Sequence, residues 1–239
     1  MELGRLEGKK LQSSVWKRAA AGCFAGLLAL GLLFLFMARI VAWDGGDFRD
    51  LELFVGWDGL LALMTALSFC VFSIFAAALG ARVVIGDYGG KTAVTLLSYP
   101  VPRKLILRAK CLLFGGVTVL TAFTENVLVM GLMYGTGLVF GVETERFTGL
   151  FVQELLASSF LMGLQAAAVG MVSVTVGWRK RSATAALVCA LVILCMFANF
   201  IAGAYRILLP AMAVLGVLLA AGGMAAYCIL ASEIEKLEV

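Results

Sequence analysis

The chain has 239 residues, of which 62% are hydrophobic and 14% are charged, and its formal net charge is +4. A soluble domain carries about 45–50% apolar and about 25% charged residues, so composition excludes a water-soluble protein. The small net charge argues against a nucleic-acid-binding surface. Histidine is absent from the sequence, which removes the commonest metal ligand and the usual general base at neutral pH.

Six apolar runs approach or exceed the length of about 20 residues that a helix needs to cross a bilayer. We therefore expect an all-α, polytopic membrane protein with a single transmembrane domain over residues 1–239 and a six-helix bundle over residues 19–231. Residues 1–18 are expected to form a cytoplasmic, interfacial segment that is weakly amphipathic, and residues 232–239 a cytoplasmic tail. The six runs are residues 19–41, 60–84, 111–142, 151–178, 183–204 and 207–231.

Lysine and arginine determine the expected orientation, because they favour the cytoplasmic side of a membrane. With the N-terminus inside, fifteen of the 19 basic residues lie on the cytoplasmic side and four on the other. The first outer connection is acidic, with five carboxylates between positions 44 and 58. Both termini are therefore expected in the cytoplasm.

Six cysteines lie within or beside the apolar runs, and none forms a C-x-x-C pair. We expect them to be reduced and to behave as small hydrophobic residues of the core.

The cytoplasmic connection between the second and third runs predicts a short helix over residues 91–98. Ala93, Val94, Leu96 and Leu97 fall on one side of this helix, and the polar residues fall on the other. Pro100 then ends it. One interpretation is a docking element on which a cytoplasmic partner pushes, and the other is an ordinary interfacial helix that anchors the loop.

Gly90-Lys91-Thr92 in the same connection matches the end of a P-loop. The first glycine of that motif would fall on Ile85, and a membrane helix precedes the motif where a P-loop needs a strand. We do not expect a nucleotide site there.

This connection resembles the first cytoplasmic loop of ABC-2-type transporter permeases, the membrane subunits of ABC transporters. Lys91 stands where the family usually has glycine, and Pro102 where a small residue is common. The likeness covers about a tenth of the chain, and the helix count and topology agree over the rest. Its residues are Asp87, Tyr88, Thr92, Leu96, Leu97, Ser98, Pro100, Arg103 and, opening the third helix, Lys110.

The resemblance implies a non-enzymatic permease subunit of an ATP-driven exporter in the bacterial cytoplasmic (inner) membrane. A separate ABC ATPase subunit would bind ATP and magnesium, so this chain would bind no cofactor itself. A second permease subunit, identical or different, would complete the transporter. Small members of this kind handle amphipathic peptides, drugs or other hydrophobic substrates. The loop helix would be the coupling helix, with Asp87, Tyr88, Lys91, Thr92, Leu96, Leu97, Ser98, Pro100 and Arg103 as ATPase-coupling residues.

Glu125 and Asn126 lie near the middle of the third run. A carboxylate at this depth costs about 2.5–3.5 kcal/mol on insertion scales, so it should face the bundle interior, a subunit interface or a wet cavity. Two interpretations stay open: a contact for a cationic substrate in the transport pathway, or a hydrogen-bonded packing contact.

Two other functions compete with the exporter. A membrane-embedded enzyme would need a nucleophile, base or metal constellation, and the sequence has no histidine, no H-E-x-x-H and no paired intramembrane aspartates. An ion-coupled secondary carrier would predict inverted repeats and several intramembrane polar groups, of which only Glu125 is a strong candidate. A membrane-embedded scaffold without an ATPase partner is a further alternative.

Overall fold

The computed structural model describes residues 14–43, 56–86, 103–139, 149–204 and 207–235. Six of its helices are long and apolar enough to cross a membrane, which confirms the six predicted spans and a multi-pass membrane protein. The elements are α2 (Ser14–Trp43), α4 (Trp57–Gly80), η2 (Ala81–Ile85), α7 (Arg103–Val139), α8 (Gly149–Arg179), α9 (Ala183–Gly203) and α10 (Leu208–Glu235).

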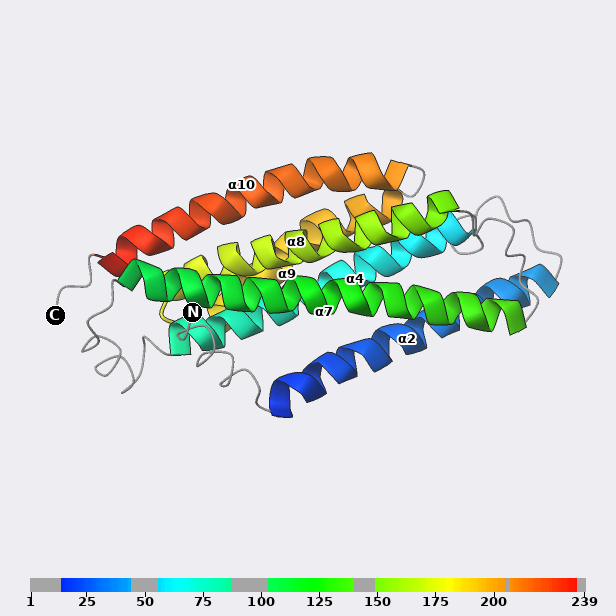
Figure 1. Ribbon diagram of the computed structural model, residues 1–239, viewed down its shortest axis with the longest axis horizontal. Helices are drawn as coiled ribbons and strands as arrows, with labels where there is room; N and C mark the ends of the chain where they lie inside the picture. Colours follow the sequence, from blue (N-terminus) through cyan, green and yellow to red (C-terminus); the bar gives the residue numbers. More distant parts are fainter. Residues whose placement is uncertain (1–13, 44–55, 87–102, 140–148, 205–206, 236–239) are drawn as a thin grey trace.

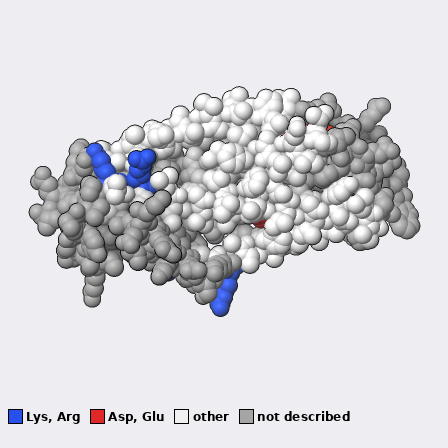
Figure 2. Space-filling view, in the orientation of Figure 1, with Lys and Arg blue, Asp and Glu red and all other residues white. Residues whose placement is uncertain are grey.

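The long helices run up and down in alternation, so α2, α7 and α9 begin at the end of the bundle where η2, α8 and α10 stop (Figure 1). We call this the basic end. In the view of Figure 2 the blue atoms of lysine and arginine gather toward it, and the middle of the described surface is almost free of charge. The lysines and arginines whose side chains are described all lie there: Arg18, Arg82, Lys104, Arg108, Lys110, Arg179, Lys180 and Arg181.

Helix α4 is the centre of the bundle. In its most apolar stretch 72% of the residues are buried, against 17% for α2. Small residues let α8 approach it closely: a Cβ added at Gly170 of α8 would lie 2.6 Å from the Cβ of Ala76 in α4. Glycine and alanine commonly permit such backbone contacts between membrane helices, where van der Waals packing replaces the hydrophobic effect as the driving force.

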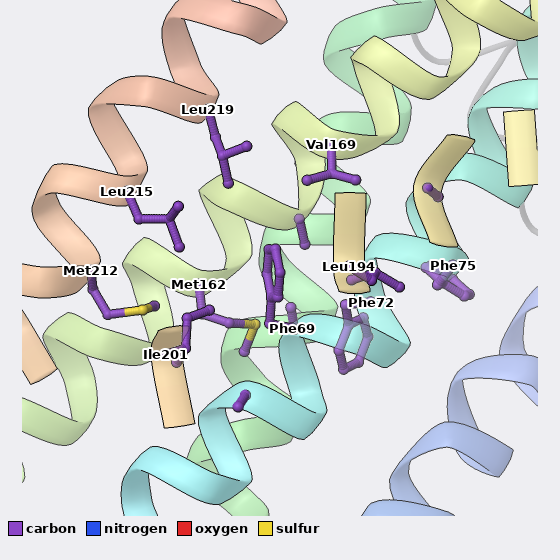
Figure 3. Close-up of a cluster of buried hydrophobic side chains, with 14 of the residues drawn as sticks. Phe69, Phe72, Phe75, Met162, Val169, Leu194, Ile201, Met212, Leu215 and Leu219 are labelled. Atoms are coloured by element: carbon purple, nitrogen blue, oxygen red, sulfur yellow. The ribbon is translucent and has the colours of Figure 1, made fainter. Parts of the chain in front are cut away.

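Figure 3 shows the part of the apolar core that α4, α8, α9 and α10 form, and side chains of α2 and α7 belong to the same core. Phenylalanines of α4 meet side chains of α8 and α9, and α10 joins this part of the core through its packing against α8. These residues are Phe69, Phe72 and Phe75 of α4, Met162 and Val169 of α8, Leu194 and Ile201 of α9, and Met212, Leu215 and Leu219 of α10.

Polar side chains also join α8 to α10. Gln165 Nε2 donates a hydrogen bond of 2.7 Å to the carbonyl of Met212. Thr175 Oγ1 donates one of 3.2 Å to the carbonyl of Ala226. Beyond the apolar stretch, Arg179 Nε lies 2.8 Å from Glu233 Oε1. In lipid such bonds contribute about 0.6 kcal/mol on average, so they fix the relative position of the two helices more than they drive association.

The helices differ from the predicted runs mainly at the basic end. Helix α7 begins at Arg103 instead of residue 111, and α10 continues to Glu235. Residues 14–18, expected in an interfacial segment, belong to α2, whereas residues 1–13 lie outside the described residues. The predicted segment 91–98 lies outside them as well. A run defined by hydropathy stops at the first charged residues. The helix itself continues as long as its backbone hydrogen bonds are satisfied.

The cysteine prediction holds only in part. All six thiols are free, as expected, but Cys195 and Cys228 are exposed and the other four are half-buried. Their description as core residues is wrong for Cys195 and Cys228, whereas Cys70 and Cys111 pack against the core.

Candidate functional site

A buried cluster of polar side chains connects α4, α7 and α8 inside the bundle. Glu125 and Asn126 of α7 are 5% and 0% exposed, so both face the interior, as the sequence predicts. Each finds a partner on α4 that the sequence analysis did not single out. Ser68 Oγ donates to Glu125 Oε2 over 3.3 Å, and Asn126 Nδ2 lies 3.5 Å from Thr65 Oγ1.

Helix α8 contributes the third side of this polar cluster. Asn126 Nδ2 donates a hydrogen bond of 2.9 Å to Ser159 Oγ, which in turn donates one of 2.6 Å to the carbonyl of Leu155 in its own helix. Asn126 therefore stands at the junction of three helices. We use the name polar cluster for Thr65, Ser68, Glu125, Asn126 and Ser159.

Two oxygens of the polar cluster have no hydrogen-bond partner in the described structure, Glu125 Oε1 and Asn126 Oδ1. Buried polar atoms normally find a partner, because an unpaired one costs about 1–3 kcal/mol. A carboxylate and an amide oxygen accept hydrogen bonds and attract positive charge. The arrangement is therefore suited to an ammonium or guanidinium group, or to a proton.

The polar cluster is less suited to a transition metal. No group of three or more histidine, cysteine, aspartate or glutamate side chains gathers among the described residues. The neighbours of Glu125 are hydroxyl and amide groups, which are hard oxygen ligands and bind such metals weakly.

The spacing of Thr65 and Ser68 is the sequence signal that points to them. They lie three residues apart in a run whose other polar residues are Ser73 and Arg82, so one face of α4 presents two hydroxyls toward a neighbouring helix. Serine and threonine are nevertheless common in membrane helices, where they bond to their own backbone, as Thr121 does to the carbonyl of Val117. Composition alone does not separate these two uses.

The predicted ATPase-coupling residues are not part of the polar cluster. Arg103 is the first residue of α7, and its side chain is not among those described. The remainder lie outside the described residues, between the end of η2 and the start of α7: Asp87, Tyr88, Lys91, Thr92, Leu96, Leu97, Ser98 and Pro100.

Comparison with known proteins finds similarity to a distant relative. No protein-family model matches the chain. A protein of Bacillus subtilis (strain 168), named "Uncharacterized protein YcbO", is 24% identical over 199 residues, which cover 83% of this chain and 84% of that protein. The similarity therefore extends through most of both chains.

Proposed function

We propose that this chain is the membrane subunit of an ATP-driven exporter of the ABC-2 type, powered by a separate ATPase subunit. One observation carries the proposal. The two helices that flank segment 87–102, α4 with η2 and α7, are the same two that share the Ser68–Glu125 hydrogen bond. The segment with the coupling-loop sequence is thus continuous with the two helices that carry Ser68 and Glu125.

The position of α4 supports this assignment. Because most of α4 is buried, a displacement at its basic end acts on the centre of the bundle. An ATPase that docks on residues 91–98 would therefore act on the most deeply buried of the six spans. The ATPase would hold the ATP and magnesium, and the basic end would face the cytoplasm of a bacterial cell.

The polar cluster indicates the class of substrate. An unpaired carboxylate oxygen among apolar helices attracts a cationic group that arrives with apolar neighbours. We propose cationic amphipathic peptides or drugs, which enter from the cytoplasm or the inner leaflet. A second permease subunit, either another copy of this chain or a related one, would complete the pathway.

A second candidate, an ion-coupled carrier, is favoured by the same carboxylate. The Glu125 carboxylate lies beside the Ser68 hydroxyl, and it can also hold a proton or a small monovalent cation. The two functions differ in their energy source, since the exporter needs ATP and the carrier needs an ion gradient.

The decisive experiment purifies the tagged chain from its native membrane and identifies what accompanies it. The exporter predicts an ABC ATPase subunit in roughly equal amount, and ATP-dependent uptake of a fluorescent cationic peptide into inside-out vesicles. Deletion of residues 91–98 should abolish both. Uptake that persists without ATP, and that an ionophore abolishes, would establish the carrier and reject the exporter.

A further inference from the structure

Lys110 occupies a core position of α7. It is 0% exposed, as is Leu107 one turn before it, and Phe114 one turn after it is 1% exposed. Residues at i, i+3 and i+7 share one face of a helix, so Lys110 stands in a row that is otherwise apolar. Arg108, only two residues away, is exposed. A buried ammonium group is costly unless it is paired, so this lysine requires an explanation beyond membrane orientation.

The ammonium group of Lys110 reaches the end of the neighbouring helix. Its Nζ donates a hydrogen bond of 3.1 Å to the carbonyl of Val83 in η2. Carbonyls in the last turn of a helix carry the negative end of the helix dipole. Lys110 thus supplies both a donor and a positive charge to the last turn of the α4–η2 helix that the structure describes.

The helix that Lys110 contacts has an unusual last turn. η2 is a π-helix, in which the backbone N–H of Gly86 bonds to the carbonyl of Ala81 five residues earlier. Such segments are rare and are frequent at functional sites.

η2 also packs against α8. A Cβ added at Gly177 of α8 would lie 2.8 Å from the Cδ1 of Ile85, so the Ile85 side chain rests on this glycine. At Gly80, just before η2, an added Cβ would lie 2.5 Å from Val174 of α8 and 3.5 Å from Phe114 of α7. η2 is therefore held on one side by packing and on another by Lys110.

We propose that Lys110 is a positioning residue that ties η2, the continuation of α4, to α7, so that a displacement of segment 87–102 reaches α4 and α7, two of the three helices of the polar cluster. Without this tie, the π-helix would unwind and absorb the displacement. The inference rests on the proposed function, in which the ATPase acts on that segment. It adds a residue that does not touch the ATPase or the substrate.

The test uses the complete transporter in lipid nanodiscs and three variants. Lys110→Met removes the donor at similar size, Lys110→Arg keeps a cationic donor, and Arg108→Met removes a charge from the exposed face as a matched control. Hydrogen exchange of residues 81–86 and 104–110 reports the tie itself. Substrate stimulation of ATP hydrolysis reports whether the displacement is transmitted between the ATPase and the polar cluster.

Lys110→Met should accelerate exchange over residues 81–86 about tenfold or more, the usual scale for one lost hydrogen bond to a charged group. It should also lower substrate stimulation by about two- to thirtyfold, the range of coupling changes that single residues produce. Lys110→Arg should restore both readouts, and Arg108→Met should leave both at their wild-type values. Unchanged exchange in Lys110→Met, or normal stimulation despite faster exchange, would overturn the inference.

The two proposals fail in distinguishable ways. If substrate stimulates no ATPase subunit bound to the wild-type chain, the proposal of an exporter is rejected, whatever the hydrogen exchange of the variants. If wild type is stimulated and Lys110→Met is stimulated equally, only the role of Lys110 fails. Should Lys110→Met not fold, the wild-type complex still decides: ATP should change exchange over residues 81–86 and 104–110 in parallel, and a change in one segment alone contradicts the tie.

Discussion

At the scale of single residues, adjacent polar side chains of α7 have different surroundings. Asn126 bonds across to Ser159 of α8 and lies near Thr65 of α4, whereas Glu125 bonds only through one oxygen to Ser68. Asn126 therefore holds three helices together. Glu125 keeps an oxygen that a ligand can use.

The first prediction concerns the charge of Glu125. Glu125→Gln keeps the size of the side chain and a carbonyl oxygen for Ser68, but it removes the negative charge. Transport of a cationic peptide should fall about tenfold or more, because hydrogen bonds to charged groups contribute about 1.5–3 kcal/mol. The measurement is ATP-dependent uptake by vesicles, with a neutral analogue of the peptide for comparison.

Glu154→Gln is the matched control for Glu125→Gln. Glu154 lies near the start of α8, away from the basic end, and it is only half-buried. This control should transport both peptides normally. Equal loss of transport for the cationic and the neutral peptide in Glu125→Gln would assign Glu125 to packing alone.

The second prediction concerns Asn126. Asn126→Ala removes the bond to Ser159, so the free energy of unfolding should fall by about 1–2 kcal/mol, near the upper values for such bonds between membrane helices. Thermal unfolding of the purified protein in detergent measures this change. Thr124→Ala is the control, because exposed Thr124 bonds only within its own helix. Equal melting temperatures for the two variants would contradict the junction role of Asn126.

At the scale of elements, α4 and α8 form the rigid centre of the bundle. Their contact depends on small residues, as at Gly170 and Ala76, so backbones and not long side chains determine the separation of the two helices. The polar cluster lies beside this contact, since Ser68 and Ser159 belong to the same two helices. A change in the spacing of α4 and α8 therefore reaches the polar cluster.

The third prediction tests this spacing. Gly170→Ala would place a Cβ 2.6 Å from the Cβ of Ala76 and 3.1 Å from its carbonyl carbon. Overpacking of this kind costs about 1–3 kcal/mol, so the melting temperature in detergent should fall. Gly116→Ala on α7 is the control, because an added Cβ meets nothing within 4 Å there. A melting temperature of Gly170→Ala at or above that of Gly116→Ala would show that the helices separate freely.

At the scale of the whole molecule, the outer helices present apolar side chains to their surroundings. α10 exposes Val214, Val217, Leu218 and Met224, and α9 exposes Met196 among others. In a chain with six membrane-spanning helices, lipid covers these apolar faces, and no soluble partner is needed to bury them. The charged groups at the basic end then lie at one membrane surface.

The fourth prediction is the orientation of the bundle. Because basic residues stay on the cytoplasmic side, a fluorescent protein fused after Val239 should fold and fluoresce, since its reporter domain remains in the cytoplasm. Alkaline phosphatase fused after residue 144, in the connection between α7 and α8, should be active outside. The exchanged fusions are the controls and should be inactive. An active phosphatase at the C-terminus would reverse the orientation.

The sequence predicts the membrane spans well but does not predict which residues of different spans contact each other. The six spans follow from apolar length, because a helix in lipid must satisfy its backbone internally and be about 20 residues long. The inward direction of Glu125 follows from the cost of a buried carboxylate. Helix ends were less predictable: α7 includes Arg103 and Lys110, since a charged side chain ends an apolar run without ending the backbone hydrogen bonds.

The sequence by itself determined that this protein has six membrane-spanning helices, that its lysines and arginines are concentrated on one side, and that Glu125 avoids lipid. That Glu125 and Asn126 face the bundle interior was decided by the structure. Only the tertiary structure decided their partners. Ser68 and Thr65 come from a helix about 60 residues earlier in the chain, and Lys110 reaches Val83 across 27 positions. Such pairings depend on which faces of two helices meet and how closely the helices approach. Small differences in packing decide both, and the composition of a single run does not contain this information.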